Sequence, residues 1–383
     1  MPRHPATAPH LEAVGGSVFS ALARRLASFE GEVYPLHVGD TWMEPAEGCR
    51  MEDLRVADHP GMHRYAPPQG IASLREALAA RVRERTATET TPEDVLITAG
   101  ATGALGTVAG ALLSPGDEVL VLAPYWPLIA GIVRSFHGIP VPVPYLGVVT
   151  SPAEGVAAVD ARHTSRTVAL YLSTPNNPTG GALDRDEIEA LVDWARSREL
   201  WLLADEVYED YLYEGEHVYA RSLAPERTFA AYSFSKAYGM AGNRCGYVVG
   251  PGDLMAQLLK VAVHTFYSTP TASQLAAERV LGAAGDRWVA DAKRRYHELG
   301  AWTAERLGVP RPVGSTFLFL DVADRLDERG LEGFLLDAAD LGLFVAPGPS
   351  FGPYPTHVRI CFTSAAPDLV QRGVEVLAGL LGR

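Results

Sequence analysis

Residues 167–180 read Thr-Val-Ala-Leu-Tyr-Leu-Ser-Thr-Pro-Asn-Asn-Pro-Thr-Gly, a mostly apolar run that ends abruptly in a polar turn. The first six residues carry no charge and predict a strand that is buried on both faces, as in a parallel sheet. The polar segment 173–180 then lies at the carboxyl end of that strand. Open α/β sheets bind their ligands at this edge, although a simple turn built from Asn, Pro and Gly fits the same residues equally well.

Runs of the same kind recur on both sides of this stretch, and helical patterns separate most of them. Because strands that alternate with helices form crossover connections, the pattern predicts an α/β fold with a mostly parallel, seven-stranded sheet between helices. A helix is also predicted over Ile71–Arg85, ahead of the first strand. The other predicted strands are Val95–Thr98, Glu118–Leu122, Val141–Pro144, Trp201–Ala204, Thr228–Tyr232 and Gly246–Val249.

The two ends of the chain have a different pattern and predict a smaller α+β domain. We expect an N-terminal arm and part of the small domain over residues 1–45, the large domain over 46–283 and the rest of the small domain over 284–383. The elements expected in these end regions are helices at Ser17–Phe29, Gly285–Leu307 and Pro367–Leu381 and strands at Val33–Val38, Thr316–Asp321, Gly342–Ala346 and His357–Cys361.

The composition indicates a cytoplasmic protein that does not bind nucleic acid or membranes. The formal net charge of −13 disfavours polyanionic partners. Three distant cysteines, Cys49, Cys245 and Cys361, disfavour a disulfide framework. No apolar run approaches the length of about 20 residues that a membrane span needs, and the N-terminus lacks a signal-peptide pattern.

An acidic residue ends another buried strand in Trp-Leu-Leu-Ala-Asp, residues 201–205. A carboxylate at the end of a buried strand is costly unless it meets a cation, and a protonated pyridine nitrogen would serve. The alternative is an Asp that caps the following helix, which is a common role at this location.

A lysine lies just after the next apolar strand, in Ser233-Phe-Ser-Lys236-Ala-Tyr-Gly-Met, and Arg244 follows eight residues later. Partial desolvation among small and aromatic residues lowers the pKa of a lysine and exposes the neutral amine that attacks a carbonyl carbon. The alternative is an ordinary surface lysine.

Taken together and in this order, the motifs resemble the fold-type I aminotransferases of class I/II, the aspartate aminotransferase-like family, over nearly the whole chain. The resemblance implies pyridoxal 5′-phosphate as cofactor and transfer of an amino group between an L-amino acid and a 2-oxo acid. It also implies a homodimer with shared active sites. Another pyridoxal phosphate reaction on the same fold (β-lyase, decarboxylase, cyclase or oxidase) stays open, as does a non-catalytic ligand-binding module.

The resemblance assigns residues around the cofactor ring. Lys236 matches the lysine that forms the Schiff base and then moves a proton between the substrate and the cofactor. Asp205 matches the carboxylate that pairs with the pyridine nitrogen. Tyr208 and Asn177 match the residues that hydrogen-bond the phenolic oxygen, and Trp126 matches the aromatic that stacks on the ring.

The phosphate and the substrate also have matches. Gly100-Ala101-Thr102 opens a helix after a strand, where free N–H groups favour an anion. Ser233 and Arg244 match the remaining phosphate ligands, and Tyr65 matches a tyrosine that reaches the phosphate of the neighbouring subunit. For the substrate, Arg359 matches the arginine that binds the α-carboxylate through its planar fork, and Gly39 matches a glycine that lines the mouth of the site.

The sequence also disfavours some sites and favours one class of substrate. Residues 100–106 lack the spacing of a dinucleotide loop, and Pro60 and Gly61 argue against a metal site at His59 and His63. Dicarboxylate enzymes of the family supply a second cation from the partner subunit, in the region after the phosphate arginine. In this sequence, residues 261–270 contain no Arg or Lys and only His264. We therefore expect an amino donor with a neutral side chain, apolar or aromatic.

Overall fold

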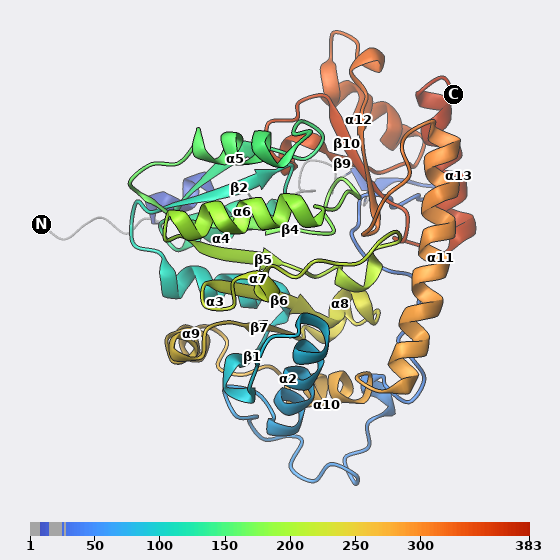
Figure 1. Cartoon of the computed structure of the whole chain (residues 1–383). Coiled ribbons are helices and arrows are strands. Elements are labelled where there is room, and N and C mark those ends of the chain that lie inside the picture. The colour runs from blue at the N-terminus through green and yellow to red at the C-terminus, as the bar shows by residue number, and fades with distance from the viewer. Residues whose placement is uncertain (1–7, 15–24, 27) are drawn as a thin grey trace, which may run out of the picture.

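The structure is a computed structural model that describes residues 8–14, 25–26 and 28–383, and its centre is one twisted sheet (Figure 1). The strands of this sheet stand in the order β1-β7-β6-β5-β4-β2-β3. All neighbouring pairs are parallel except those of β7, which runs antiparallel to both β1 and β6. The strands are β1 (Val95–Thr98), β2 (Glu118–Ala123), β3 (Ile139–Pro144), β4 (Thr167–Ser173), β5 (Trp201–Asp205), β6 (Thr228–Ser233) and β7 (Gly246–Val249). The predicted α/β fold with a mostly parallel seven-stranded sheet is confirmed.

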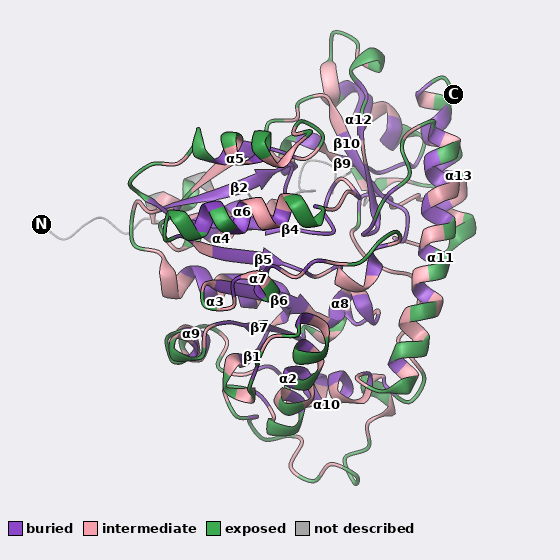
Figure 2. Cartoon of the chain, viewed as in Figure 1, coloured by how far each residue is buried: buried purple, intermediate pink, exposed green. Residues whose placement is uncertain are grey.

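Helices cover both faces of this sheet, so its central strands are buried throughout (Figure 2). Alternate residues of β2 enter different cores: Leu120 and Leu122 pack on the side of α2 and α6, whereas Val119 and Val121 pack on the side of α3, α4 and α9. This double burial explains why the strands are continuous apolar runs. The helices around the sheet are α2 (Ala72–Thr86), α3 (Gly100–Leu112), α4 (Pro127–Ser135), α5 (Pro152–Asp160), α6 (Arg185–Ser197), α7 (Ala220–Leu223), α8 (Phe234–Ala237), α9 (Gly252–Thr265) and α10 (Thr271–Arg279).

A second, smaller body is built around a three-stranded antiparallel sheet in the order β8-β10-β9. Its strands are β8 (Phe317–Asp321), β9 (Ala346–Pro347) and β10 (His357–Cys361), and its helices are α11 (Ala283–Leu307), α12 (Gly330–Asp340) and α13 (Pro367–Leu380). The long helix α11 runs from the lower part of the large sheet up to this body (Figure 1).

The N-terminal segment joins the small body. Leu36 is fully buried in the same core as β8, β10 and α13, and Tyr34 forms an isolated bridge with Leu343. These contacts support our proposal that a domain boundary lies near residue 45 and a second one near residue 283, where α11 begins.

Two predicted strands are wrong in extent. Val33–Val38 forms no regular strand, because only Tyr34 pairs with another segment. The strand predicted at Gly342–Ala346 is reduced to Ala346–Pro347, since residues 342–345 leave α12 through a turn and do not pair with β10. Most of the helix predicted over Ser17–Phe29 falls outside the described residues.

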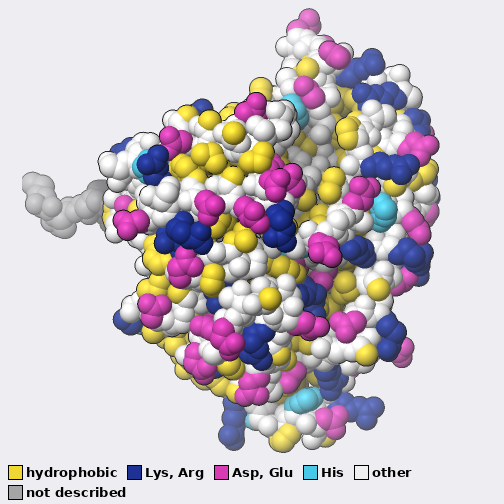
Figure 3. Space-filling view, viewed as in Figure 1, with side chains coloured by type: hydrophobic (Ala, Val, Ile, Leu, Met, Phe, Trp, Pro, Cys, Tyr) yellow, Lys and Arg dark blue, Asp and Glu magenta, His cyan; other side chains and the backbone are white. Residues whose placement is uncertain are grey.

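The surface is mixed in charge. Acidic and basic side chains are interspersed over the face that Figure 3 shows, in keeping with a moderate excess of acids. Cys49, Cys245 and Cys361 are buried free thiols. Among the described residues, no helix is both long enough and apolar enough to cross a membrane.

Candidate active site

A pocket of about 360 Å³ lies at the carboxyl edge of the central strands, between the large sheet and the small body. It gathers residues from strand ends, helix starts and loops that are far apart in the sequence. Its lining consists of Gly39, Ala101, Thr102, Trp126, Pro127, Leu128, Ser173, Asn177, Asp205, Val207, Tyr208, Ser233, Ser235, Lys236, Ala241, Arg244, Phe351 and Arg359. Every predicted site residue except Gly100 and Tyr65 is in this lining.

Three neighbouring parallel strands each end at the pocket with a polar side chain. Ser173 ends β4, Asp205 ends β5 and Ser233 ends β6. Ser173 and Asp205 are direct partners in the register of β4 and β5, so the two side chains lie next to each other. The polar residues that the sequence predicts at strand ends therefore meet at one edge of the sheet, where open α/β sheets bind their ligands.

Lys236 enters the pocket from the short helix α8, directly after β6. Ser233 caps this helix through its Oγ, which accepts a hydrogen bond of 3.0 Å from the Ser235 N–H. The Lys236 ammonium donates to the carbonyl oxygen of Gly39, and its Nζ lies 4.0 Å from the Asp40 carboxylate. Only 15% of the Lys236 side chain is exposed, and burial lowers the pKa of its amine.

Asp205 is buried and accepts a hydrogen bond of 2.7 Å from the Tyr171 hydroxyl. The Val207 N–H donates a longer bond of 3.4 Å to its other oxygen. Desolvation outweighs both donors and raises the pKa of Asp205 to about 6. A cation that reached this carboxylate would restore its ionised form, which makes Asp205 a receptor for a positively charged group.

The opposite wall is suited to an anion. α3 starts at Gly100, and the first N–H groups of a helix have no partner within it. Gly100 has a φ of +71°, and a Cβ there would come within 2.6 Å of Nη2 of Arg244. Arg244 donates to the backbone carbonyls of Ala241 and Ala99, and no acid pairs with it within the described chain. The guanidinium and the helix start therefore leave a positively charged cradle.

Arg359 comes from β10 and is a buried cation without an acidic partner among the described residues. Its Nη1 donates to Oδ1 of Asn177 over 3.1 Å, and its Nη2 donates to the His37 carbonyl over 2.6 Å. The guanidinium carbon lies 4.3 Å from the ring centre of Phe317 and 4.9 Å from that of Phe351. Burial lowers the pKa of Arg359 to about 10, which leaves it charged at neutral pH. A carboxylate is the natural ligand of such a group.

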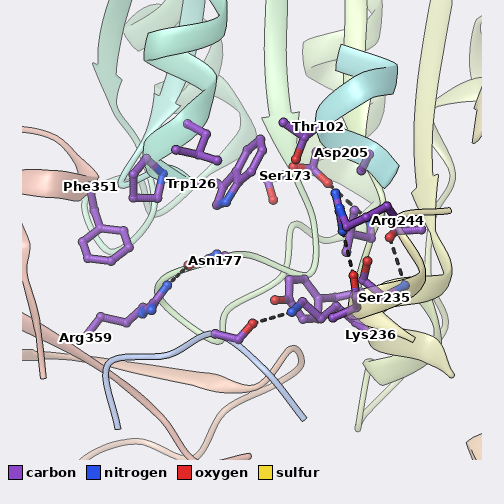
Figure 4. Close-up of a pocket in the computed structure, with 18 residues that line it drawn as sticks. Thr102, Trp126, Ser173, Asn177, Asp205, Ser235, Lys236, Arg244, Phe351 and Arg359 are labelled. Atoms are coloured by element: carbon purple, nitrogen blue, oxygen red, sulfur yellow. Dashed lines mark hydrogen bonds between the residues drawn. The ribbon is translucent and has the colours of Figure 1, made fainter. Parts of the chain in front are cut away.

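The remaining predicted residues complete the walls. Tyr208 is buried beside Asp205, and Trp126 is half-buried at the N-cap of α4. Figure 4 shows Trp126, Asn177 and Arg359 on one side of the pocket and Arg244 and Lys236 on the other. The pocket therefore has separate places for an anion, at Arg244, and for a carboxylate, at Arg359.

Tyr65 does not reach this pocket. Its side chain is 85% exposed, and its ring packs edge-on against Tyr267 with 5.0 Å between the ring centres. His59 lies beside Arg279, at 3.1 Å, and the described residues contain no group of His, Cys, Asp and Glu side chains suited to a metal ion.

Several residues at or beside the pocket were not predicted from the sequence. Ser173 ends β4, and Ser235 lies in α8 directly before Lys236, so their places beside the predicted site residues were a usable signal. Tyr171 lies inside β4, and its bond to Asp205 could be inferred only from the register of β4 and β5. Leu128 and Phe351 carry no chemical signal, because only the tertiary fold brings them to the pocket.

These residues fit pyridoxal phosphate at three points. The positively charged cradle at Arg244 fits the phosphate group. A Cβ at Gly100 would come within 2.6 Å of Nη2 of Arg244, so the glycine keeps this space open. Asp205 requires a cation in a buried place, which a protonated ring nitrogen supplies. Lys236 offers an amine of lowered pKa on the side of the pocket where Arg244 lies.

Comparison with known proteins agrees with this geometry. A family model described as aminotransferase class I and II matches residues 34–377. The chain is 36% identical over 343 residues to an aspartate/prephenate aminotransferase of Thermus thermophilus, covering 87% of each chain. It is 35% identical over 388 residues to an arginine–pyruvate transaminase of Pseudomonas aeruginosa, covering 96% of each.

Solved structures of aminotransferases share the fold. The aspartate aminotransferase of Thermus thermophilus with maleate superposes with a TM-score of 0.88 at 32% identity, over 98% of this chain and 100% of that one. An aromatic aminotransferase of Pyrococcus horikoshii gives 0.83 at 26% identity, over 94% and 98%. The chain therefore belongs to the aminotransferase class I and II family, and it is a pyridoxal-phosphate-dependent transaminase of fold type I.

Proposed function

We propose that this transaminase takes its amino group from an L-amino acid with a neutral side chain, apolar or aromatic, and passes it to a 2-oxo acid. The observation that carries the proposal is the number of cations in the pocket. Within the described lining these are Lys236, Arg244 and Arg359. Each of the three has a task in the proposed reaction, so the subunit's own lining has no cation left over for a second carboxylate. The segment 261–270, through which the resemblance has the partner subunit supply such a cation, contains no Arg or Lys.

The negative charge of Asp40, next to Lys236, also favours a donor with a neutral side chain. The Asp40 carboxylate lies 4.0 Å from Nζ of Lys236, and its side chain is 48% exposed. An acid at this position repels a second carboxylate on a substrate by Coulomb interaction. A neutral donor meets no such penalty.

The names of the relatives do not decide the substrate. They refer to aspartate and prephenate in Thermus thermophilus, arginine and pyruvate in Pseudomonas aeruginosa and an aromatic aminotransferase in Pyrococcus horikoshii. Because these relatives differ widely in donor, the pocket of this chain is the better guide.

We assign the cofactor to the residues that the resemblance predicted. Gly100, Ala101, Thr102, Ser233 and Arg244 would hold the phosphate through N–H groups, hydroxyls and a guanidinium. Asp205 would hold the ring nitrogen, Tyr208 and Asn177 the phenolic oxygen, and Trp126 would pack on the ring face. The support is that all of these residues except Gly100 line one pocket, and that Gly100 lies against Arg244.

When bound, pyridoxal phosphate draws electrons from the substrate's Cα and so makes the Cα proton acidic. Lys236 would hold the cofactor covalently through Nζ until the amino group of the substrate replaces it. The freed amine is neutral at a lower pH than an ordinary lysine, because burial lowers its pKa. Nζ can then accept the Cα proton and return it to another carbon, acting first as base and then as acid.

Arg359 would fix the substrate while the proton moves. Its buried guanidinium offers a planar fork to the α-carboxylate, and the rings of Phe317 and Phe351 hold that fork in place. Gly39 lies at the mouth, where a Cβ would come within 3.8 Å of Nη1 of Arg359 and 3.2 Å of the Phe317 ring. A small residue there leaves room for the carboxylate.

We further propose that the active unit is a homodimer. Tyr65 is 85% exposed and Tyr267, its ring partner, is 43% exposed. An aromatic pair this exposed favours a protein surface as its partner. In the proposed dimer, Tyr65 would donate its hydroxyl to the phosphate held by the other subunit.

A screen of amino donors with the purified holoenzyme tests the substrate class. Single turnovers with phenylalanine, leucine, alanine, aspartate and glutamate are followed by the absorbance change as the cofactor takes the amine form. We expect the second-order rate constant for phenylalanine or leucine to exceed that for aspartate at least about 10-fold. Faster conversion by aspartate or glutamate would contradict the proposal, and recovery of the spectrum with a 2-oxo acid verifies that the reaction is transamination.

A further inference from the structure

The apolar part of the pocket is concentrated at the end where Arg359 lies. Figure 4 shows Phe351 beside Arg359, Trp126 between this end and Ser173, and Ser235 and Arg244 at the other end. Pro127 and Leu128 follow Trp126 directly in the sequence and also line the pocket. The polar end suits the phosphate, so the apolar end is left to the substrate.

A backbone hydrogen bond joins the two halves of this apolar wall. The Tyr125 N–H donates to the Phe351 carbonyl over 3.1 Å, which places Phe351 next to the residue that precedes Trp126. One half of the wall is thus the start of α4, and the other is the short helix η7 (Gly348–Phe351) of the small body. The bond aligns them as one surface.

The wall begins directly at the predicted carboxylate site. The Phe351 ring centre lies 4.9 Å from the guanidinium carbon of Arg359. The α-carboxylate and the side chain of an amino acid are attached to the same Cα atom. A substrate whose carboxylate is held by Arg359 therefore has its side chain within reach of Phe351 and of the start of α4.

Leu128 is the exposed member of this wall. Phe351 is fully buried and packs edge-on against Phe319, with 5.7 Å between ring centres, so it is held in place. Leu128 is 44% exposed although it lines the pocket. An apolar side chain that faces both the pocket and water gains most when a ligand covers it.

We propose that Leu128, with Phe351 as the fixed part of the same apolar wall, forms the subsite for the donor's side chain and selects bulky apolar donors over dicarboxylates. The inference depends on the proposed function, since it names the residue that carries the neutral-donor preference. Leu128 is a specificity residue and takes no part in moving the proton, so it changes which donors react and leaves cofactor binding unchanged.

Two substitutions at this position test the subsite. Leu128→Ala removes the apolar contact and should lower the rate constant for phenylalanine and leucine about 5- to 30-fold, with less than about a twofold change for alanine. Leu128→Arg adds a fourth cation, free to bind a second carboxylate, and should raise the ratio of the aspartate to the phenylalanine rate constant at least about 10-fold. Single-turnover absorbance measurements give both values, and cofactor content is measured separately in each variant.

Ile139→Arg is the matched control. Ile139 resembles Leu128 in size and is 40% exposed, but it starts β3 at the opposite edge of the sheet. This variant should keep the wild-type ratio of aspartate to phenylalanine. If both arginine variants changed the ratio of the aspartate to the phenylalanine rate constant equally, the effect would come from net charge. The proposed subsite at Leu128 would then be refuted.

The outcomes separate the two proposals. If the wild-type enzyme itself prefers aspartate, the neutral-donor function fails. If the wild type prefers phenylalanine and Leu128→Ala, loaded with cofactor, reacts with it as fast as the wild type, the function stands and the role of Leu128 is refuted. A loss that is equal for alanine and phenylalanine also refutes it, because a side-chain subsite must distinguish the two.

Discussion

Replacing Asp205 by asparagine should change how the stability of the cofactor-free protein depends on pH. Burial raises the pKa of this carboxyl from 3.8 to about 6 in the folded protein. The folded state then holds the proton more tightly than the unfolded state, so the contribution of Asp205 to stability is highest at low pH. It is lost as the pH rises from the unfolded value through the folded one.

The magnitude follows from the two pKa values. Full ionisation of Asp205 costs the cofactor-free protein about 3 kcal/mol, of which about 1.4 kcal/mol is lost between pH 5 and pH 8. The asparagine of the variant does not titrate, and its side-chain oxygen can still accept from the Tyr171 hydroxyl. From pH 5 to pH 8 the unfolding free energy of the wild type should therefore fall by about 1.4 kcal/mol relative to that of Asp205→Asn.

Urea unfolding of both cofactor-free proteins at pH 5, 6, 7 and 8, at one protein concentration, measures this difference. The pKa of the neighbouring Glu206 is raised to about 8, mainly by burial. Glu206 is present in both proteins, so its titration largely cancels; the Asp205 charge is the smallest of the causes that raise its pKa. Parallel curves would refute the reasoning that Asp205 is a desolvated carboxyl. With pyridoxal phosphate bound, the ring nitrogen should supply the counter-charge and the wild-type curve should flatten.

Three further predictions concern the other ends of the pocket. Borohydride should fix a pyridoxyl group on the wild type and on Lys260→Ala, a surface control, while Lys236→Ala should show neither this adduct in its mass spectrum nor turnover. Arg359→Ala should raise the KM for amino acid and 2-oxo acid at least about 10-fold, and an unchanged KM, as expected for the exposed Arg311→Ala, would exclude the carboxylate role. Phe317→Leu removes the ring over the guanidinium and should raise KM about 2- to 30-fold with kcat nearly constant; a fall in kcat alone would argue against a positioning role.

The large sheet was predictable because burial on both faces leaves a simple pattern. Strands such as β2 and β5 are uninterrupted apolar runs, so their positions follow from composition alone. The small body was harder to predict, since β9 has only two residues and gains its place by pairing with β10. Val33–Val38 has the apolar pattern of a strand because Leu36 packs into the core of the small body. Burial alone produces this pattern, so the pattern does not show that the segment pairs with a strand.

The site divides in a similar way. Asp205 and Lys236 were predictable because each is a charged residue that follows an apolar run at or just after the end of a strand. Arg359 required the family resemblance, since an arginine in a strand is not unusual by itself. Leu128 and Phe351 could not be predicted, because only the tertiary fold, through the bond between the Tyr125 N–H and the Phe351 carbonyl, brings their two segments to one pocket.

The guanidinium of Arg359 on β10, which has no acidic partner among the described residues, has a practical consequence for kinetic experiments. Acetate, citrate and sulfate are anions of the kind that this guanidinium binds, so each should compete with the substrate carboxylate for it. Kinetic constants measured in such buffers will understate the affinity for amino acids. A zwitterionic sulfonate buffer too bulky to enter, with chloride held constant, gives the fairer comparison between donors.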